Sequence, residues 1–322
     1  MRKLILKCAL LLFIVGTILY LGGAAYRQSN AYRNLERIEE TENLHSIPER
    51  IDIAVFGPSH GRDAFKYPPK GQILFNFSLS SQTPQYDAAM LRQYQDQIDP
   101  GALIILTFTY MSPYWTDTED AFQSKQPRYY RILSPENIVD VDLSRYWLGQ
   151  LYPLLILEPG DIASAFLKST PLIATSDGRV GHNHLSPEDV LEGQTRIKQD
   201  HWGLITPVYP EVNPVMWDAY REMLELCRER GWKAVLVTPP YLSVYNDCFP
   251  GGFYESFLSR VEELAEAYGV PYLNYSHDPD FAECYDFYRD IDHLNLDGAA
   301  VFNEKFFSDI QALWLLDRNR QT

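Results

Sequence analysis

Short apolar runs alternate with amphipathic segments from residue 51 onward, and this alternation restricts the fold more than any other feature of the chain. Ile51–Phe56 and the apolar run Ala102–Thr109 have the length and composition of buried strands. An apolar strand without polar alternation is typical of a parallel sheet that is covered on both faces. Further strands are expected at Gln72–Phe77, Lys233–Thr238 and Val270–Asn274, and helices at Pro84–Ile98, Pro214–Arg230, Phe253–Tyr268 and about Asp297–Leu316. Residues 51–322 are therefore expected to form an α/β three-layer sandwich with a mostly parallel sheet.

Residues 114–215 interrupt this alternation and are expected to form an insertion after the third strand. A span of that length needs structure of its own, so several helices are expected in it. Its aromatic residues include Tyr129, Tyr130, Trp147, Tyr152, Trp202 and Tyr209. The insertion could be a lid or substrate-binding subdomain over the carboxyl ends of the strands, or a structural elaboration that never meets substrate; the sequence favours neither. His182 and His184 could bind a metal, but no ligand at suitable spacing joins them, which favours surface histidines.

An uncharged run at residues 8–25 is long enough to span a bilayer. Arg2, Lys3 and Lys7 precede it, which keeps the N-terminus in the cytoplasm and places the remaining chain outside. The run exceeds the usual length of a signal-peptide core, so residues 1–25 are expected to be an uncleaved anchor. The alternative is a signal peptide cleaved after Gly23–Ala25, which would release a secreted protein. The polar residues 26–50 are expected to form a stalk.

Charge and cysteine content restrict partners and redox chemistry. The 322 residues carry a formal charge of −15 with a pI near 4.9. A surface this acidic argues against sequence-independent binding of nucleic acid, which requires clustered Lys and Arg. In an exported domain, Cys248 and Cys284 are both expected in loops near the site and could form a disulfide.

A serine follows the first strand in the sequence I-D-I-A-V-F-G-P-S-H-G-R-D. Gly57 and Pro58 end the apolar run, and Ser59 follows at once. A buried strand that ends in a tight turn bearing one hydroxyl is a usual setting for a nucleophilic serine. The same letters also describe an ordinary turn whose serine caps a helix or faces water.

A second stretch, Asp290–Ala299, places a carboxylate three residues before a histidine and ahead of a helix. Loops at the carboxyl ends of parallel strands converge, so His293 could meet Ser59 despite the long separation in sequence. Asp290 is the expected partner of His293, because the neighbouring Asp292 would point to the opposite face of an extended segment. With His293 as base, the rate is expected to fall as the pH drops through the ordinary histidine range near about 6.5.

These two stretches resemble the SGNH (GDSL-like) hydrolase superfamily. Gly57-Pro58-Ser59 matches its nucleophile block and Asp290-Ile291-Asp292-His293 its Asp-x-x-His block, while Ser59-His60 is similar to the form in SGNH domains of envelope acyl-transfer proteins. The resemblance implies a flavodoxin-like fold and a catalytic triad of Ser59, His293 and Asp290. The middle blocks depart from the family, with Ser78 where glycine is expected and no asparagine within Thr107–Ser112. Oxyanion or substrate contacts are expected from Gly57, His60, Ser78 and Tyr110.

The resemblance also implies an extracytoplasmic serine esterase that acts through an acyl-serine, with no metal and no organic cofactor. The expected substrate is an acylated envelope glycan or another ester. If the acceptor is a sugar hydroxyl instead of water, the protein is an O-acyltransferase that works with a multi-spanning partner delivering acyl groups. A third alternative is a non-catalytic scaffold or glycan-binding protein with a relict triad.

Overall fold

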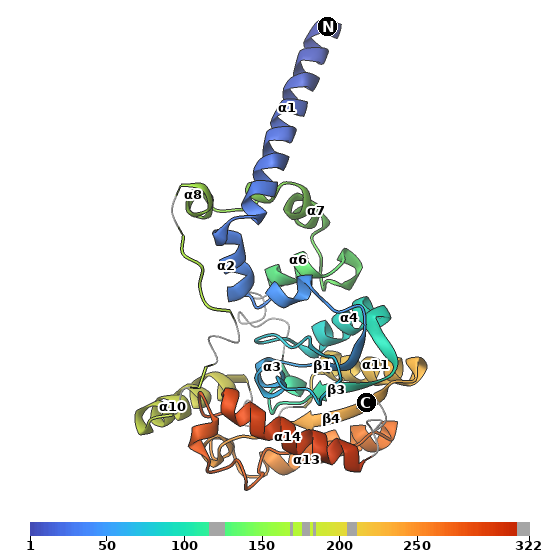
Figure 1. Ribbon diagram of the computed structural model, residues 1–322, viewed down its shortest axis with the longest axis vertical. Helices are drawn as coiled ribbons and strands as arrows, with labels where there is room; N and C mark the ends of the chain where they lie inside the picture. Colours follow the sequence, from blue (N-terminus) through green and yellow to red (C-terminus); the bar gives the residue numbers. More distant parts are fainter. Residues whose placement is uncertain (116–125, 168–169, 176–180, 183–184, 205–210, 314–322) are drawn as a thin grey trace. The chain divides into compact units, whose positions relative to one another are not determined.

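The computed structural model describes residues 1–322 apart from 116–125, 168–169, 176–180, 183–184, 205–210 and 314–322. The chain divides into two compact units, shown in Figure 1. Unit 1 comprises Met1–His45 and Gln126–Ser176, and unit 2 comprises Ser46–Lys125 and Asp177–Thr322. Each unit is therefore assembled from two separate stretches of sequence. The boundaries expected at residues 25 and 50, and the insertion at 114–215, stay predictions.

Unit 2 contains a five-stranded parallel sheet in the order β2-β1-β3-β4-β5. The strands are β1 (Ile51–Phe56), β2 (Leu74–Asn76), β3 (Ile98–Thr107), β4 (Lys233–Thr238) and β5 (Tyr272–Asn274). This order is that of flavodoxin-like sheets, in which ligands bind at the carboxyl ends of the strands where the strand order reverses. Here the reversal lies at β1, which pairs with β2 on one side and β3 on the other.

Helices cover both faces of this sheet. The helices in the described part of unit 2 are α3 (Ser59–Ala64), α4 (Pro84–Tyr94), α10 (Pro187–Leu204), α11 (Pro214–Arg230), α12 (Ser243–Asn246), α13 (Phe253–Tyr268) and α14 (Leu296–Ala312), with 3-10 turns η2 (Gln95–Gln97), η3 (Ser112–Tyr114) and η7 (Tyr285–Phe287). Helices α4 and α11 lie on one side of the sheet and α13 and α14 on the other (Figure 1). All six residues of β1 are buried between these layers. The predicted α/β sandwich with a parallel sheet is confirmed.

Apolar run length and helix caps account for most element boundaries. Strands β1 and β4 and helices α11 and α13 begin and end where the sequence predicts them. Asn213 accepts the Val215 N–H at the start of α11, and Gly231 ends it in the left-handed conformation at φ 70°. Strand β3 begins four residues earlier than expected, because Ile98 pairs with Ile51 across a register shift. That early start also ends α4 at Tyr94 instead of Ile98.

Unit 1 is helical in its described residues. It contains α1 (Arg2–Arg27), α2 (Asn30–Ile38), α6 (Tyr129–Ile132), α7 (Leu143–Leu151) and α8 (Pro159–Phe166), with 3-10 turns η1 (Glu42–His45), η4 (Gln126–Arg128), η5 (Pro135–Asn137) and η6 (Pro153–Leu155). Helix α1 has 26 residues and an 18-residue window of mean hydropathy 2.5, which is long and apolar enough to cross a membrane. Such a helix is compatible with either a single-pass anchor or a signal sequence.

The two cysteines expected to pair are both free thiols. Cys248 is buried, and its Sγ donates to the Val244 carbonyl at 3.3 Å, which directs the thiol onto α12. Cys284 is partly exposed. The predicted disulfide is therefore wrong.

Candidate active site

Ser59 is held at the carboxyl end of β1 by a turn that only glycine fits. Gly57 has φ +147°, and a Cβ there would lie 2.6 Å from the Thr107 Cβ on β3. Pro58 is the N-cap of α3, and Ser59 is the first residue of that helix. The strand, the turn and the helix together present the Ser59 hydroxyl at the edge of the sheet where ligands are expected.

His293 reaches Ser59 from the loop between η7 and α14. An isolated antiparallel bridge joins Tyr288 to Leu294 and closes this loop. The Arg289 N–H also donates to the His293 carbonyl at 3.1 Å. The Nε2 of His293 lies 2.8 Å from the Ser59 Oγ, although 234 positions separate the two residues.

Asp290 orients His293 through two hydrogen bonds to one oxygen. Its Oδ1 accepts the backbone N–H of His293 at 2.8 Å and lies 2.9 Å from His293 Nδ1. A carboxylate accepts only, so Nδ1 carries the proton and Nε2 is left free to accept one from Ser59. The structure thus brings together Ser59, His293 and Asp290, the three residues expected to form a triad.

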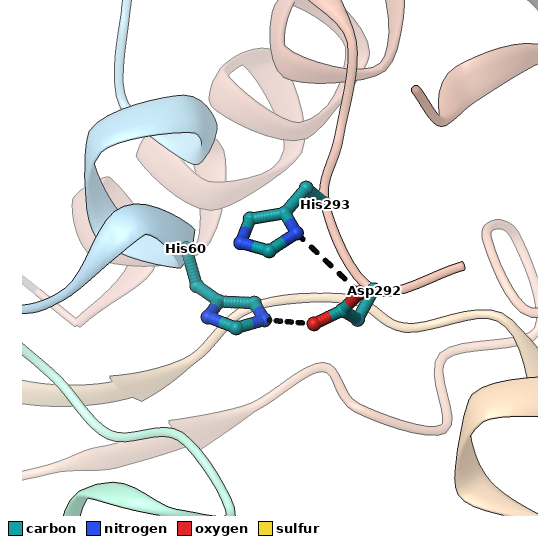
Figure 2. Close-up of side chains that lie close together, drawn as sticks. All are labelled: His60, Asp292 and His293. Atoms are coloured by element: carbon teal, nitrogen blue, oxygen red, sulfur yellow. Dashed lines mark hydrogen bonds and ion pairs between the residues drawn. The ribbon is translucent and has the colours of Figure 1, made fainter. Parts of the chain in front are cut away.

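The expectation that Asp292 points away from His293 is wrong. Its side chain is buried, with one carboxylate oxygen 3.0 Å from His60 Nε2 and the other 3.4 Å from His293 Nδ1. Residues 290–293 form a tight turn instead of an extended segment, so adjacent side chains do not alternate between faces. Figure 2 shows Asp292 bridging the two imidazoles.

The side chain of His60, a residue expected to contact the oxyanion or the substrate, lies against the ring of His293. The two rings stack with centroids 4.1 Å apart and planes 18° apart. Burial, followed by repulsion from His293, lowers the pKa of His60 to about 4 despite the nearby Asp292. The neutral ring then donates its Nε2 proton to Asp292, and its buried Nδ1 has no hydrogen-bond partner among the described residues.

Two carboxylates determine the basicity of His293. Burial lowers the pKa of His293, but the charges of Asp290 and Asp292 outweigh burial and raise it to about 9. Burial likewise raises the pKa of Asp292, yet His293 and His60 outweigh it and hold that pKa well below the ordinary value. The site therefore stabilises an imidazolium at position 293, which is the charge that forms when a histidine takes a proton from serine.

The cluster of His60, Asp292 and His293 also has the composition of a metal site, with ligand atoms within 4.8 Å of one another. Both ring nitrogens of His293 are already engaged, however, Nε2 with Ser59 and Nδ1 with Asp290. A cation could bind these three residues only by displacing one of those bonds. The hydrogen-bonded network accounts for the cluster by itself.

A buried ion network that the sequence did not reveal ties the His293 loop to α3. Asp63 is fully buried and accepts two bonds from Arg62, at 2.7 and 2.8 Å, and two contacts from Arg289, at 3.1 and 3.0 Å. Burial raises the pKa of Asp63, but the two guanidinium groups outweigh it and depress that pKa strongly. The adjacent opposite charges of Arg62 and Asp63, three residues after Ser59 in a segment that must pack on the sheet, were the signal available in the sequence.

Ser78 and Tyr110, also expected to contact the oxyanion or the substrate, fit an oxyanion hole poorly. The Ser78 N–H donates to Asn76 Oδ1 at 3.0 Å, so it is not free for a substrate. Tyr110 is buried among aromatic rings, and its hydroxyl donates to Asn246 Oδ1 at 2.8 Å. The structure therefore places Tyr110 in the core. Gly57 shapes the turn and brings no side chain of its own.

Helix α10, in the second half of the expected insertion, packs on the His293 loop. A Cβ on Gly193 would lie 3.0 Å from Ile291, and Arg196 Nη2 lies 3.6 Å from Asp292. His182 is exposed and pairs with Asp297 at 2.9 Å, while His184 lies outside the described residues. Of the expected aromatic residues, Tyr129, Tyr130, Trp147 and Tyr152 belong to unit 1, and the side chains of Trp202 and Tyr209 lie outside the described part.

No protein-family model matches this sequence, and no curated protein matches it either. Among solved structures, the chain is similar to a "putative acylhydrolase" from Bacteroides fragilis NCTC 9343. The two are 12% identical, and the similarity covers 88% of this chain and 98% of the other with a TM-score of 0.39.

Proposed function

We propose that unit 2 catalyses acyl transfer from an ester through a covalent acyl-serine on Ser59. The observation that carries this proposal is the continuous hydrogen-bonded chain from Ser59 through His293 to Asp290, with distances of 2.8 and 2.9 Å. A nucleophile bonded to a base that is oriented by a carboxylate is the arrangement that activates serine for attack on a carbonyl.

The proposed reaction proceeds in two halves. The Ser59 Oγ attacks the ester carbonyl while His293 Nε2 takes the hydroxyl proton. The tetrahedral intermediate then collapses, His293 returns that proton to the leaving alcohol oxygen, and the acyl group remains on Ser59. In the second half His293 deprotonates the acceptor hydroxyl, which attacks the acyl-serine and restores Ser59. Asp290 and Asp292 stabilise the imidazolium in both halves.

The oxyanion of each tetrahedral intermediate needs hydrogen-bond donors. The backbone N–H groups of Ser59 and His60 lie in the first turn of α3, where a helix leaves N–H groups without intrahelical partners. We assign these two groups as the oxyanion donors, since the Ser78 N–H is occupied. An SGNH-type site would thus operate here without the glycine and asparagine of the middle blocks.

The location and the substrate are proposed from the sequence. With α1 as an anchor and the N-terminal basic residues inside, unit 2 lies outside the cytoplasm. The proposed substrate is an acylated envelope glycan or another ester available at that location. The acceptor is water in an esterase and a sugar hydroxyl in an O-acyltransferase working with a multi-spanning acyl-donor partner.

A fluorophosphonate probe tests the nucleophile in the detergent-solubilised full chain. We expect labelling of the native protein, with the adduct mapped to Ser59, and no labelling of Ser59→Ala. Ser259→Ala is the matched control, because Ser259 is exposed on α13 and its hydroxyl donates to Glu263. Native protein that resists the probe while folded would favour the non-catalytic alternative.

The acceptor is determined by a second assay on the same preparation. Acetyl release from an acetylated glycan is measured with and without an unacetylated oligosaccharide. Release that does not depend on the oligosaccharide indicates an esterase. Acetylation of the oligosaccharide at the expense of release indicates transfer.

A further inference from the structure

Helix α7 and the η6 turn of unit 1 carry an apolar face that the described part of the unit leaves uncovered. Leu143, Trp147 and Leu151 follow one another at four-residue spacing along α7, so they share one side of the helix. Trp147 is 53% exposed, and Leu155, in η6, is 54% exposed. Single exposed apolar residues are common, but a contiguous set of this kind marks a surface that contacts something apolar.

The same segment packs against the apolar helix α1, beside which it lies in Figure 1. A Cβ on Gly22 would lie 2.8 Å from Leu154 Cδ1, and one on Gly23 would lie 2.8 Å from the Pro153 ring. Farther along α1, a Cβ on Gly16 would lie 3.6 Å from the Tyr152 hydroxyl. Small residues let two segments approach this closely.

Polar contacts fix this docking at the C-terminal end of α1. Arg27 Nη2 donates to the carbonyls of Gly149 and Gln150 at 3.1 and 2.6 Å, which satisfies carbonyl groups at the end of α7. Tyr26 is only 4% exposed. The last turn of α1 is therefore part of the interior of unit 1, and the level of α7 along α1 is defined.

The contacts place this segment at the depth of the bilayer. A helix rises about 1.5 Å per residue, so the contacts from Gly16 to Gly23 extend over about 10 Å of α1. They extend from the middle of the uncharged run at residues 8–25 toward its C-terminal end. Whatever touches this stretch of a membrane-spanning helix lies at the level of the hydrocarbon core or its boundary with the headgroups.

We propose that the apolar face of α7 and η6 lies in the membrane interface, in contact with lipid, so that this part of unit 1 is partly immersed in the membrane beside the anchor. The inference rests on the proposed anchoring by α1. Lipid is the occupant because acyl chains surround every side of a spanning helix that protein does not cover. The exposed Arg145 on α7 carries a charge that can reach the headgroups from a partly immersed helix.

Depth-dependent quenching tests this contact in the full chain reconstituted in phospholipid vesicles. Leu151→Cys and Leu155→Cys are each labelled with an environment-sensitive fluorophore, in a background that replaces the accessible Cys8 and Cys284 by serine. Glu136→Cys is the matched control, because Glu136 is an exposed polar residue of the same unit. Vesicles containing lipid with a nitroxide on the acyl chain should quench the labels at 151 and 155 at least twofold more than the label at 136.

Equal quenching at all three positions would overturn the inference. Extraction with alkaline carbonate, performed on the same vesicles, separates this result from a failure of the anchor. Protein that stays in the vesicle pellet but shows equal quenching contradicts only the lipid contact, whereas released protein contradicts the anchor as well. Positions that a membrane-impermeant maleimide modifies in vesicles but not in cells would show that another membrane protein covers the face, which also contradicts lipid contact.

Discussion

At the scale of single residues, His293 is placed between two carboxylates that have different tasks. Asp290 fixes the tautomer by accepting both the backbone N–H and the ring Nδ1 proton. Asp292 is the more deeply buried of the two and is shared with the neutral ring of His60. The pair stabilises the imidazolium more strongly than one carboxylate could, and this has a measurable effect on pH dependence.

The pH profile of kcat/KM should rise through an inflection near 9, because His293 must be neutral to accept a proton and its pKa is raised to about 9. This replaces the expectation of an inflection at the ordinary histidine pKa of about 6.5. The Asp292→Asn variant loses one negative charge beside the ring, so its inflection should move to lower pH. An inflection that stays in place in this variant would contradict a role for the Asp292 charge.

The two carboxylates should also differ in turnover. Asp290→Asn should lower kcat about 10⁴-fold, because an amide that donates to Nδ1 stabilises the wrong tautomer. Asp292→Asn should lower kcat on the order of 10² or less, since its amide oxygen can still accept from His60. Single-turnover rates above pH 9, with circular dichroism as the check on folding, separate the two. The reverse order of effects would mean that Asp292 is the orienting residue.

At the scale of elements, the site depends on two connections, namely the turn from β1 into α3 and the ion network from α3 to the His293 loop. Gly57 determines the geometry of the first connection through its conformation and its contact with Thr107. Asp63 determines the second, because Arg62 and Arg289 converge on its carboxylate. Gly57 and Asp63 are not assigned to the reaction itself, yet each connection sets the distance between nucleophile and base.

Gly57→Ala should abolish labelling of Ser59 by the fluorophosphonate. The variant should still fold, but with a lower free energy of unfolding. A Cβ at this position meets Thr107 at 2.6 Å, and φ +147° is strained for any side chain. Gly251→Ala is the control, since a Cβ there meets nothing within 4 Å. Normal labelling of Gly57→Ala would show that the turn tolerates more than its geometry indicates.

Asp63→Asn should destabilise unit 2 by about 3–5 kcal/mol, because it leaves two guanidinium groups without their shared buried charge. The depressed pKa of Asp63 means that this stabilisation is present above about pH 4 and is lost as the pH falls below it. The difference between native and variant in chemical unfolding should therefore shrink in acid. Asp218→Asn, which removes an exposed pair with Arg221, should cost under about 1 kcal/mol.

At the scale of the whole molecule, retention of α1 is the expectation that follows from its packing in unit 1. Cleavage after Ala25 would remove Gly22 and Gly23 from their contacts with Leu154 and Pro153. The mature protein in membranes should therefore keep its N-terminal segment, as measured by intact mass. A reporter fused after residue 322 should be active only outside the cytoplasm; cytoplasmic activity would refute the proposed topology.

The sequence predicted the features of the fold that depend on local patterns of residues. Strands β1 and β4 and helices α11 and α13 follow from run length and caps, and the meeting of Ser59 with His293 follows from how parallel strands converge. It did not predict that residues 126–176 group with the N-terminal segment, because that pairing is long-range and leaves no periodic signal. It also misplaced Asp292, because a tight turn was taken for an extended segment.

The order of the two units along the chain has a practical consequence for making the protein. Because each unit consists of two stretches that alternate along the chain, one truncation cannot isolate unit 2. A truncated protein that begins at residue 26 or 46 still carries residues 126–176, now deprived of the α1 surface on which Pro153 and Leu154 pack. Such a truncated protein is expected to expose apolar surface and to aggregate. Isolating unit 2 therefore requires two edits, removal of the first 45 residues and replacement of residues 126–176 by a polar linker.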